Sequence, residues 1–215
     1  MTIKLIIFDL DGTLVDSLDD LTDATNHMLS LLGRPTLTSE SVRQLVGQGA
    51  RRLVERALVN GTEAEVERGI DAFLTYNGEH LSDRSRLYPG VRETLEVLHG
   101  IGLPLTVISN KNVALCRGLL KVLGLEGYFA AVLGADSLPF RKPSPEPLLK
   151  LLRDFRTSPA TAIMVGDSIN DVAAGRGAGV VTVGCTYGYG DLAELRDADY
   201  RIDELPQLLK LPFFN

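Results

Sequence analysis

Five short runs of β-branched and apolar residues constrain the fold of this 215-residue chain more than any other feature of its sequence. Each run is almost continuously apolar and is bounded by turn residues, which is typical of a parallel strand buried on both faces. Segments with helical spacing of apolar residues lie between the later runs. This alternation predicts a doubly wound, Rossmann-like α/β core with a parallel sheet and right-handed crossovers. The runs are 3–8, 105–109, 131–134, 162–165 and 180–183.

The segment between the first two runs is far too long to be a single crossover. It extends from residue 9 to residue 104, whereas a crossover connection needs only about a dozen residues. Its apolar residues recur at helical spacing in four groups, and glycine, proline and asparagine separate the groups. We therefore expect a small helical cap domain at 15–85, inserted into a hydrolase core made of 1–14 and 86–215.

The composition excludes several classes of protein. The chain is 45% apolar with a net charge of −6, and it lacks the basic character of nucleic-acid-binding proteins. No apolar run approaches the ~20 residues of a spanning helix, and the N-terminal residues do not resemble a secretory signal. The two cysteines, Cys116 and Cys185, have no metal-binding spacing. These features predict a cytoplasmic protein without a membrane or nucleic-acid partner, present as a monomer or homodimer.

Two aspartates follow the first predicted strand, in the segment Asp9-Leu10-Asp11-Gly12-Thr13. Residues two apart in an extended segment point the same way, so these carboxylates would repel each other at the end of a buried strand. A divalent cation would relieve the repulsion and keep Asp9 ionised as a nucleophile. Asp-Gly is also ordinary turn chemistry, so this segment alone does not decide between a site and a turn.

Polar residues follow three further predicted strands. Ser109 and Asn110 precede a predicted helix, where a hydroxyl and free backbone N–H groups can bind phosphate. Lys142 precedes Pro143 in the next loop, and Asp167 and Asp171 follow the fourth strand. Each has a plain alternative, helix N-capping for Ser109, Asn110 and the aspartates, and a solvated turn for Lys142. Because ligands bind at the carboxyl ends of strands in such sheets, four signals at four strand ends favour one shared site.

With these four segments in order, the sequence resembles the haloacid dehalogenase-like hydrolase superfamily. The resemblance implies that Asp9 is a nucleophile that forms an aspartyl-phosphate, and that Asp11 is the general acid and base. It implies that Ser109, Asn110 and Lys142 hold the phosphoryl group. It further implies that Mg²⁺ is bound by Asp9, by the backbone carbonyl of Asp11, by Asp167 and by Asp171.

Residue types separate the reactions found within this superfamily. Dehalogenases lack the second aspartate, which is present here as Asp11, and phosphonate cleavage needs a lysine in the cap. The sequence has no lysine between Lys4 and Lys111, so the resemblance favours a phosphatase acting on a small phosphorylated metabolite. A β-phosphoglucomutase-like transfer within a sugar phosphate uses the same aspartate pair and remains an alternative, as does a non-catalytic binding protein.

Looser similarities point to bacterial phosphoglycolate phosphatases, chiefly Val46-Gly47-Gln48-Gly49-Ala50 in the cap and Tyr187-Gly188-Tyr189-Gly190 after the fifth strand. Gly47 and Gly49 would let backbone amides approach a small carboxylate, and Arg51 or Arg52 could pair with it. The glycines could equally only separate two helices, with both arginines solvated. Related caps serve pyrophosphate and sugar phosphates, so 2-phosphoglycolate is the first of several candidate substrates.

Overall fold

A computed structural model describes residues 2–214 and contains the predicted parallel sheet. Six strands pair in the order β5-β4-β1-β6-β7-β8, and every neighbouring pair is parallel. The predicted fold class is confirmed. The strands are β1 (Leu5–Phe8), β4 (Leu105–Ile108), β5 (Phe129–Leu133), β6 (Ala162–Gly166), β7 (Val181–Cys185) and β8 (Tyr200–Ile202).

The strand order places β1 in the middle of the sheet. From β1 the chain adds β4 and β5 on one side, then returns to add β6, β7 and β8 on the other. The point where the order reverses lies beside β1, and such a switch point leaves a crevice at the carboxyl ends of the strands. Residues that follow β1, β4 and β6 therefore lie at the expected place for a ligand.

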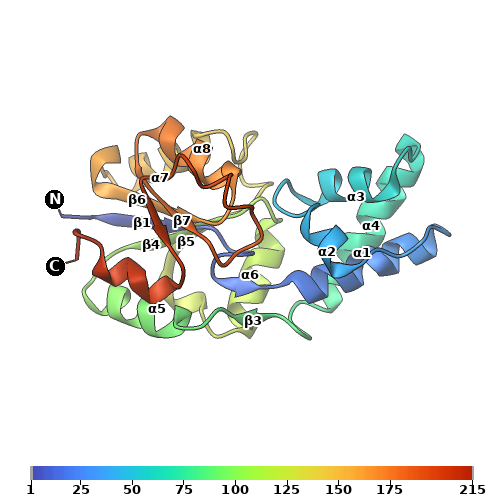
Figure 1. Cartoon of the computed structure of the whole chain (residues 1–215), viewed down its shortest axis with the longest axis horizontal. Coiled ribbons are helices and arrows are strands. Elements are labelled where there is room, and N and C mark those ends of the chain that lie inside the picture. The colour runs from blue at the N-terminus through green and yellow to red at the C-terminus, as the bar shows by residue number, and fades with distance from the viewer. Residues whose placement is uncertain (1, 215) are drawn as a thin grey trace.

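Helices cover both faces of the sheet, as Figure 1 shows. Ile6 and Phe8 of β1 pack into one apolar cluster with α5 (Val91–Gly100) and α6 (Val113–Val122). Leu5 and Ile7 face the opposite way and pack with α7 (Glu146–Asp154) and α8 (Ile169–Ala178). Successive side chains of a strand point to opposite faces, so two covered faces require the continuous apolar run seen in the sequence.

Four helices after β1 form a separate cap beside the strand ends (Figure 1). They have their own apolar cluster, which includes Met28, Val54 and Phe73. Helix α4 packs along α1 and α3, and Gly69 allows its close approach to α3 because a Cβ there would lie 2.8 Å from Val54. The helices are α1 (Leu18–Leu31), α2 (Ser39–Arg43), α3 (Ala50–Leu58) and α4 (Glu63–Glu79).

Two chain segments join the cap to the core. They are β2 (Val15–Asp16) and β3 (Arg86–Leu87), which pair antiparallel. Asp20, buried at the start of α1, accepts hydrogen bonds from the backbone N–H of Arg84 (3.0 Å) and of Ser85 (2.8 Å). The Asp20 carboxylate thus holds the segments that leave and re-enter the core side by side.

The sixth strand, β8, was not predicted from the sequence. It has only three residues and lies at the edge of the sheet, and of these three only Ile202 is buried. Such a segment lacks the continuous apolar run that marks the inner strands. The C-terminal segment beyond it forms a 3₁₀-helix, η3 (Leu205–Lys210), that packs against α5. Among the described residues, no helix is long and apolar enough to cross a membrane.

Candidate active site

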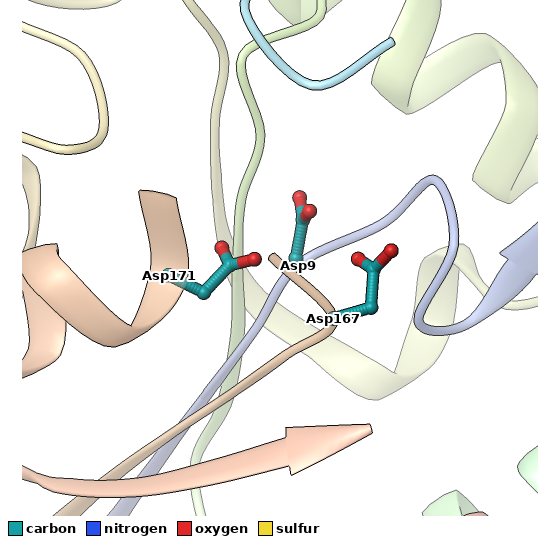
Figure 2. Close-up of side chains that lie close together, drawn as sticks. All are labelled: Asp9, Asp167 and Asp171. Atoms are coloured by element: carbon teal, nitrogen blue, oxygen red, sulfur yellow. The ribbon is translucent and has the colours of Figure 1, made fainter. Parts of the chain in front are cut away.

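Three carboxylates from three parts of the chain meet at the switch point of the sheet. Asp9 directly follows β1, Asp167 follows β6, and Asp171 lies in the first turn of α8. Figure 2 shows the three side chains gathered at the end of the central strands. One oxygen from each lies within 4.8 Å of the others. The structure therefore brings together Asp9, Asp167 and Asp171, which the sequence predicted to share a metal site.

Lys142 reaches this acidic cluster from the loop between β5 and α7. Its Nζ atom lies 2.8 Å from Asp9 Oδ1 and 2.6 Å from Asp171 Oδ1. The side chain is only 2% exposed, so the ammonium is held in place by these carboxylates and not by water. The angles of the contact with Asp9 are poor for a hydrogen bond, so the buried Asp9 Oδ1 forms an ion pair with Lys142 but no well-aligned hydrogen bond within residues 2–214.

Backbone and hydroxyl donors hold the Asp167 carboxylate. It accepts hydrogen bonds from Thr13 Oγ1 at 3.1 Å and from the backbone N–H of Tyr189 at 2.7 Å. Gly12, with φ of +86°, and Gly188 press against the same side chain, and a Cβ at either position would overlap the Asp167 side chain. The glycine in the first motif and a glycine after β7 are thus both explained by close approach to one carboxylate.

The Asp171 carboxylate is engaged on both of its oxygens. Oδ2 accepts hydrogen bonds from the backbone N–H (3.1 Å) and hydroxyl (2.8 Å) of Ser168, which completes a capping box at the start of α8. Oδ1 takes the bond from Lys142. Asp171 thus caps α8, one of the alternatives left open by the sequence, and also positions Lys142. Of the three carboxylates, Asp9 is the one with a buried oxygen that receives no well-aligned hydrogen bond from any described residue.

The ionised cluster is electrostatically costly without a cation. Burial raises the pKa of Asp9 to about 8, against the opposing effect of Lys142 and with added repulsion from Asp171 and Asp167. Burial and the charge of Asp171 raise the pKa of Asp167 to about 7. Burial disfavours the Lys142 ammonium, but Asp171 and Asp9 outweigh this effect and raise its pKa. Carboxylate oxygens are the ligands that hard divalent cations prefer, and a cation here would offset the repulsion. The donor set therefore fits a divalent metal ion.

We expect the free energy of unfolding to fall with rising pH when no such ion is bound, and the bound ion to offset this fall. Because the folded-state pKa values of Asp9 and Asp167 lie above the ordinary value of 3.8, the folded protein binds more protons than the unfolded one in this interval. This contribution therefore lowers stability as pH rises from about 4 to 8. Mg²⁺ at 100 times its Kd should restore about 2.7 kcal/mol. Thermal unfolding between pH 5 and pH 8, in chelator and in Mg²⁺, measures the effect.

The gain from Mg²⁺ should be larger at pH 8 than at pH 5, because protons compete with the ion for the same oxygens. The Asp9→Asn variant is the matched control, since an amide at this position cannot take up a proton. Its decline in melting temperature with pH, in chelator, should be smaller than that of the wild type. An equal gain from Mg²⁺ at both pH values would contradict a metal site made of these carboxylates.

Asp11 lies apart from the acidic cluster and has partners of its own. Its carboxylate accepts a hydrogen bond from the Ser17 hydroxyl at 2.6 Å and pairs with Lys111 Nζ at 3.0 Å. The sequence analysis did not identify Lys111 as a site residue. Its position directly after Ser109 and Asn110, at the end of β4, was the available signal. The Lys111 ammonium is thus a second cation of the site, and it lies beside Asp11 and not beside Asp9.

Ser109 and Asn110 lie buried at the end of β4, ahead of α6. The Asn110 amide donates to the backbone carbonyls of Gly47, at 2.8 Å, and of Lys142, at 2.9 Å. Asn110 therefore joins the cap segment at Gly47 to the loop that carries Lys142. Neither residue is the N-cap of α6, which is Asn112, so the capping alternative does not account for them.

A cavity of about 60 Å³, here called the inner cavity, opens from Asp9 and Asp11 between the core and the cap. From the core, Ser109, Asn110 and Lys111 line it. Its cap wall contains two glycines that the sequence analysis singled out. The cap residues that line it are Leu21, Val46, Gly47, Gly49, Ala50, Leu53, Phe73, Leu74 and Asn77.

Arg51, expected to contact the substrate, does not line this cavity. Its guanidinium pairs instead with Glu63 at 3.1 Å, and also with Glu55 and Glu67. Successive residues of an α-helix are about 100° apart, and in α3 it is Ala50 and Leu53 that face the cavity. Arg51 therefore points to the outer side of the cap, and Arg52 pairs with Glu55 at 2.9 Å. This arrangement favours the alternative that the sequence left open, in which both arginines are solvated.

A second, larger cavity of about 220 Å³ also borders Asp9 and is lined by Asp167, Arg43 and Arg56. Arg43 of the cap donates to the backbone carbonyls of Gly188 (3.2 Å) and Tyr189 (3.1 Å) in the loop that holds Asp167. Arg56 donates to the carbonyl of Gln44 at 2.7 Å. The sequence analysis did not identify Arg43, because its helix gives no sign of the loop it meets. Arg43 thus links the cap to the loop after β7 whose backbone binds the Asp167 carboxylate.

Comparisons with known proteins agree with this geometry. A family model described as haloacid dehalogenase-like hydrolase matches residues 6–185. A relative from Chromobacterium violaceum named phosphoglycolate phosphatase is 42% identical over 97% of this chain and 96% of its own length. One of that name from Haemophilus influenzae is 42% identical over 97% of both. A crystal structure from Haemophilus somnus, described as a predicted phosphoglycolate phosphatase, is 38% identical, with a TM-score of 0.93 over 98% of both chains. These similarities confirm the resemblance predicted from the motifs.

Proposed function

We propose that this chain, which belongs to the haloacid dehalogenase-like hydrolase family, is a Mg²⁺-dependent phosphatase that hydrolyses a short phosphate monoester. The first candidate substrate is 2-phosphoglycolate, after the name of the relatives that align over nearly the whole chain. One observation carries the proposal above the others. The Asp9 carboxylate lies against Lys142 and two further aspartates, beside a cavity that Asp11 also lines.

The proposed reaction has two displacements at phosphorus. An oxygen of Asp9 attacks the phosphorus atom, and the bond from phosphorus to the leaving-group oxygen breaks, which leaves an aspartyl-phosphate on Asp9. Asp11 gives its proton to the leaving oxygen. Asp11 then takes a proton from water as that water attacks the same phosphorus atom. The bond from phosphorus to the Asp9 oxygen breaks, inorganic phosphate leaves, and Asp9 is again a free carboxylate.

The other residues of the site position the phosphoryl group and balance its charge. Lys142, Ser109 and the backbone N–H of Asn110 would hold the phosphoryl oxygens, and Asp171 would keep Lys142 in place. Asp9, Asp167 and the backbone carbonyl of Asp11 would hold Mg²⁺, whose charge offsets that of the phosphoryl oxygens when it is bound. Phosphoryl transfer depends mainly on such positioning and charge neutralisation, because little other covalent chemistry is required.

The proposed function is tested by assaying phosphate release from a panel of phosphate esters, in Mg²⁺ and in chelator. The panel contains 2-phosphoglycolate, ethyl phosphate, pyrophosphate, glucose 1-phosphate and p-nitrophenyl phosphate. We expect release that requires Mg²⁺ and is fastest, by kcat/KM, with 2-phosphoglycolate. An isomerised sugar phosphate without phosphate release would contradict a phosphatase. Faster release from a sugar phosphate or pyrophosphate would leave the phosphatase in place and change its substrate.

A further inference from the structure

One cap side chain in the inner cavity has no partner within the part of the chain that the structure describes. Asn77, in α4, is 2% exposed and lines the cavity. Its Oδ1 atom is fully buried without a partner among the described residues, whereas its Nδ2 atom, which also makes no hydrogen bond there, is not fully buried. Oδ1 can only accept a hydrogen bond, so a ligand acceptor in the cavity would meet the Nδ2 donors of this amide. The proposal below therefore concerns Nδ2.

The surroundings of Asn77 make it distinctive. Every other described cap residue that lines the inner cavity is apolar or glycine, with Leu21, Leu53 and Phe73 among them. The opposite wall, from the core, contains the phosphate-binding candidates and Asp9. A phosphate monoester held by the core would therefore extend its leaving group towards an apolar cap wall that offers one hydrogen-bonding side chain.

The size of the cavity and the charged residues near it limit which leaving groups would fit. Of the two cavities that Asp9 and Asp11 line, the inner one is the smaller, at about 60 Å³ against about 220 Å³, which favours a short leaving group. The cationic cap residues Arg43 and Arg56 line the other cavity, and donors of both guanidiniums are used by backbone carbonyls. Among the described cap residues that line the inner cavity, Asn77 is thus the one whose side chain can donate a hydrogen bond, in addition to the backbone N–H groups at the start of α3.

We propose that Asn77 is a specificity-determining residue whose amide donates a hydrogen bond to a carboxylate at the distal end of the substrate's leaving group. The inference rests on the proposed function, because it assumes that the core holds the phosphate. It replaces the arginine expected from the sequence by a neutral amide deeper in the cap. A neutral donor can bind a carboxylate without a second buried charge, and its loss leaves a buried anion without a partner.

The test compares 2-phosphoglycolate with ethyl phosphate, which has the same carbon chain without the carboxylate. In Asn77→Leu, the ratio of kcat/KM for the two esters should fall about 10- to 100-fold, the range of a hydrogen bond to a charged group. Ethyl phosphate should be hydrolysed as well as before or better. Asn77→Asp, which places a like charge near the carboxylate, should lower the ratio further. Thr75→Leu, on the exposed side of α4, is the control and should leave the ratio unchanged.

A binding measurement separates this inference from the proposed function. The Kd of 2-phosphoglycolate is measured by calorimetry on Asp9→Asn, with and without Asn77→Leu, and needs no turnover. A weaker Kd with Asn77→Leu supports the inference even if the wild type hydrolyses none of the esters, a result that would contradict only the phosphatase. The melting temperature of Asn77→Leu should not fall, because the change removes an unpaired buried amide. An unchanged kcat/KM ratio, or an unchanged Kd, would overturn the role of Asn77.

Discussion

Asp9→Asn should reduce kcat by at least about 10⁴-fold with every phosphate ester that the wild type hydrolyses, because an amide cannot act as the nucleophile. The substitution keeps the shape of the side chain and removes one of three crowded carboxylates. Since burial and the neighbouring aspartates already raise the pKa of Asp9 to about 8, its ionised form is disfavoured in the folded protein. We therefore expect a melting temperature in chelator that is equal to or higher than that of the wild type.

Two measurements make this prediction specific to a covalent mechanism. Wild-type protein mixed with ³²P-labelled ester and quenched in acid should retain label on the chain, whereas Asp9→Asn should retain none. Asp197→Asn is the matched control, because Asp197 is exposed and pairs only with Arg176, at 3.7 Å, among the described side chains. It should keep both activity and label. Turnover of Asp9→Asn at a rate comparable to the wild type would exclude the proposed mechanism.

Lys142→Met should have the second-largest effect, on both activity and stability. The ammonium lies 2.8 Å from Asp9 and 2.6 Å from Asp171 in a buried setting, and methionine keeps much of its length without its charge. Loss of one partner from a buried ion pair typically costs about 3–5 kcal/mol, since the remaining charge is left uncompensated. Loss of a group that stabilises the transferring phosphoryl group should lower kcat by about 10²- to 10³-fold or more.

A double variant separates the two effects of Lys142. In Lys142→Met with Asp171→Asn, one of the two carboxylates left without Lys142 is also removed, so the free energy of unfolding should recover in part while activity stays low. Urea unfolding and phosphate release from the best ester measure these quantities. Lys150→Met, an exposed residue of α7 that pairs with Asp154 at 2.7 Å, is the control and should change neither. Full activity in Lys142→Met would show that this lysine does not hold the phosphoryl group.

Local sequence patterns were sufficient for the architecture of the core. The continuous apolar runs predicted five strands of the sheet, and the structure contains a strand at each, with ends that differ by up to two residues. The excess length before the second strand predicted an inserted helical segment, which the structure shows as α1 to α4. Within this sheet the short edge strand β8 was missed, because a strand that is exposed on one side lacks this pattern. The two-residue strands β2 and β3 were not predicted either.

The sequence predicted which residues form the candidate site but only some of the contacts between them. Residues at the ends of adjacent parallel strands lie close together whatever the details of packing, so Asp9 and Asp167, after the paired strands β1 and β6, could be grouped from their order. Lys142 reaches them only through the path of the loop after the edge strand β5. The roles of Arg43 and Lys111 could not be read, because each depends on which neighbour lies across a gap between segments far apart in sequence. The outward direction of Arg51 depends on the rotation of one short helix, about 100° per residue.

The sequence by itself determined the layered α/β core, the place of the insertion and the set of polar residues at the strand ends, since these follow from hydrophobic period and strand order. The tertiary structure alone decided how the cap helix α4 is turned, which cavity each side chain enters, and that the cap contributes the amide of Asn77 and no arginine to the inner cavity. The physical reason is that a strand end is positioned by the hydrogen bonds of its own sheet. A cap side chain is positioned by packing between two units, and no local pattern in the sequence encodes that packing.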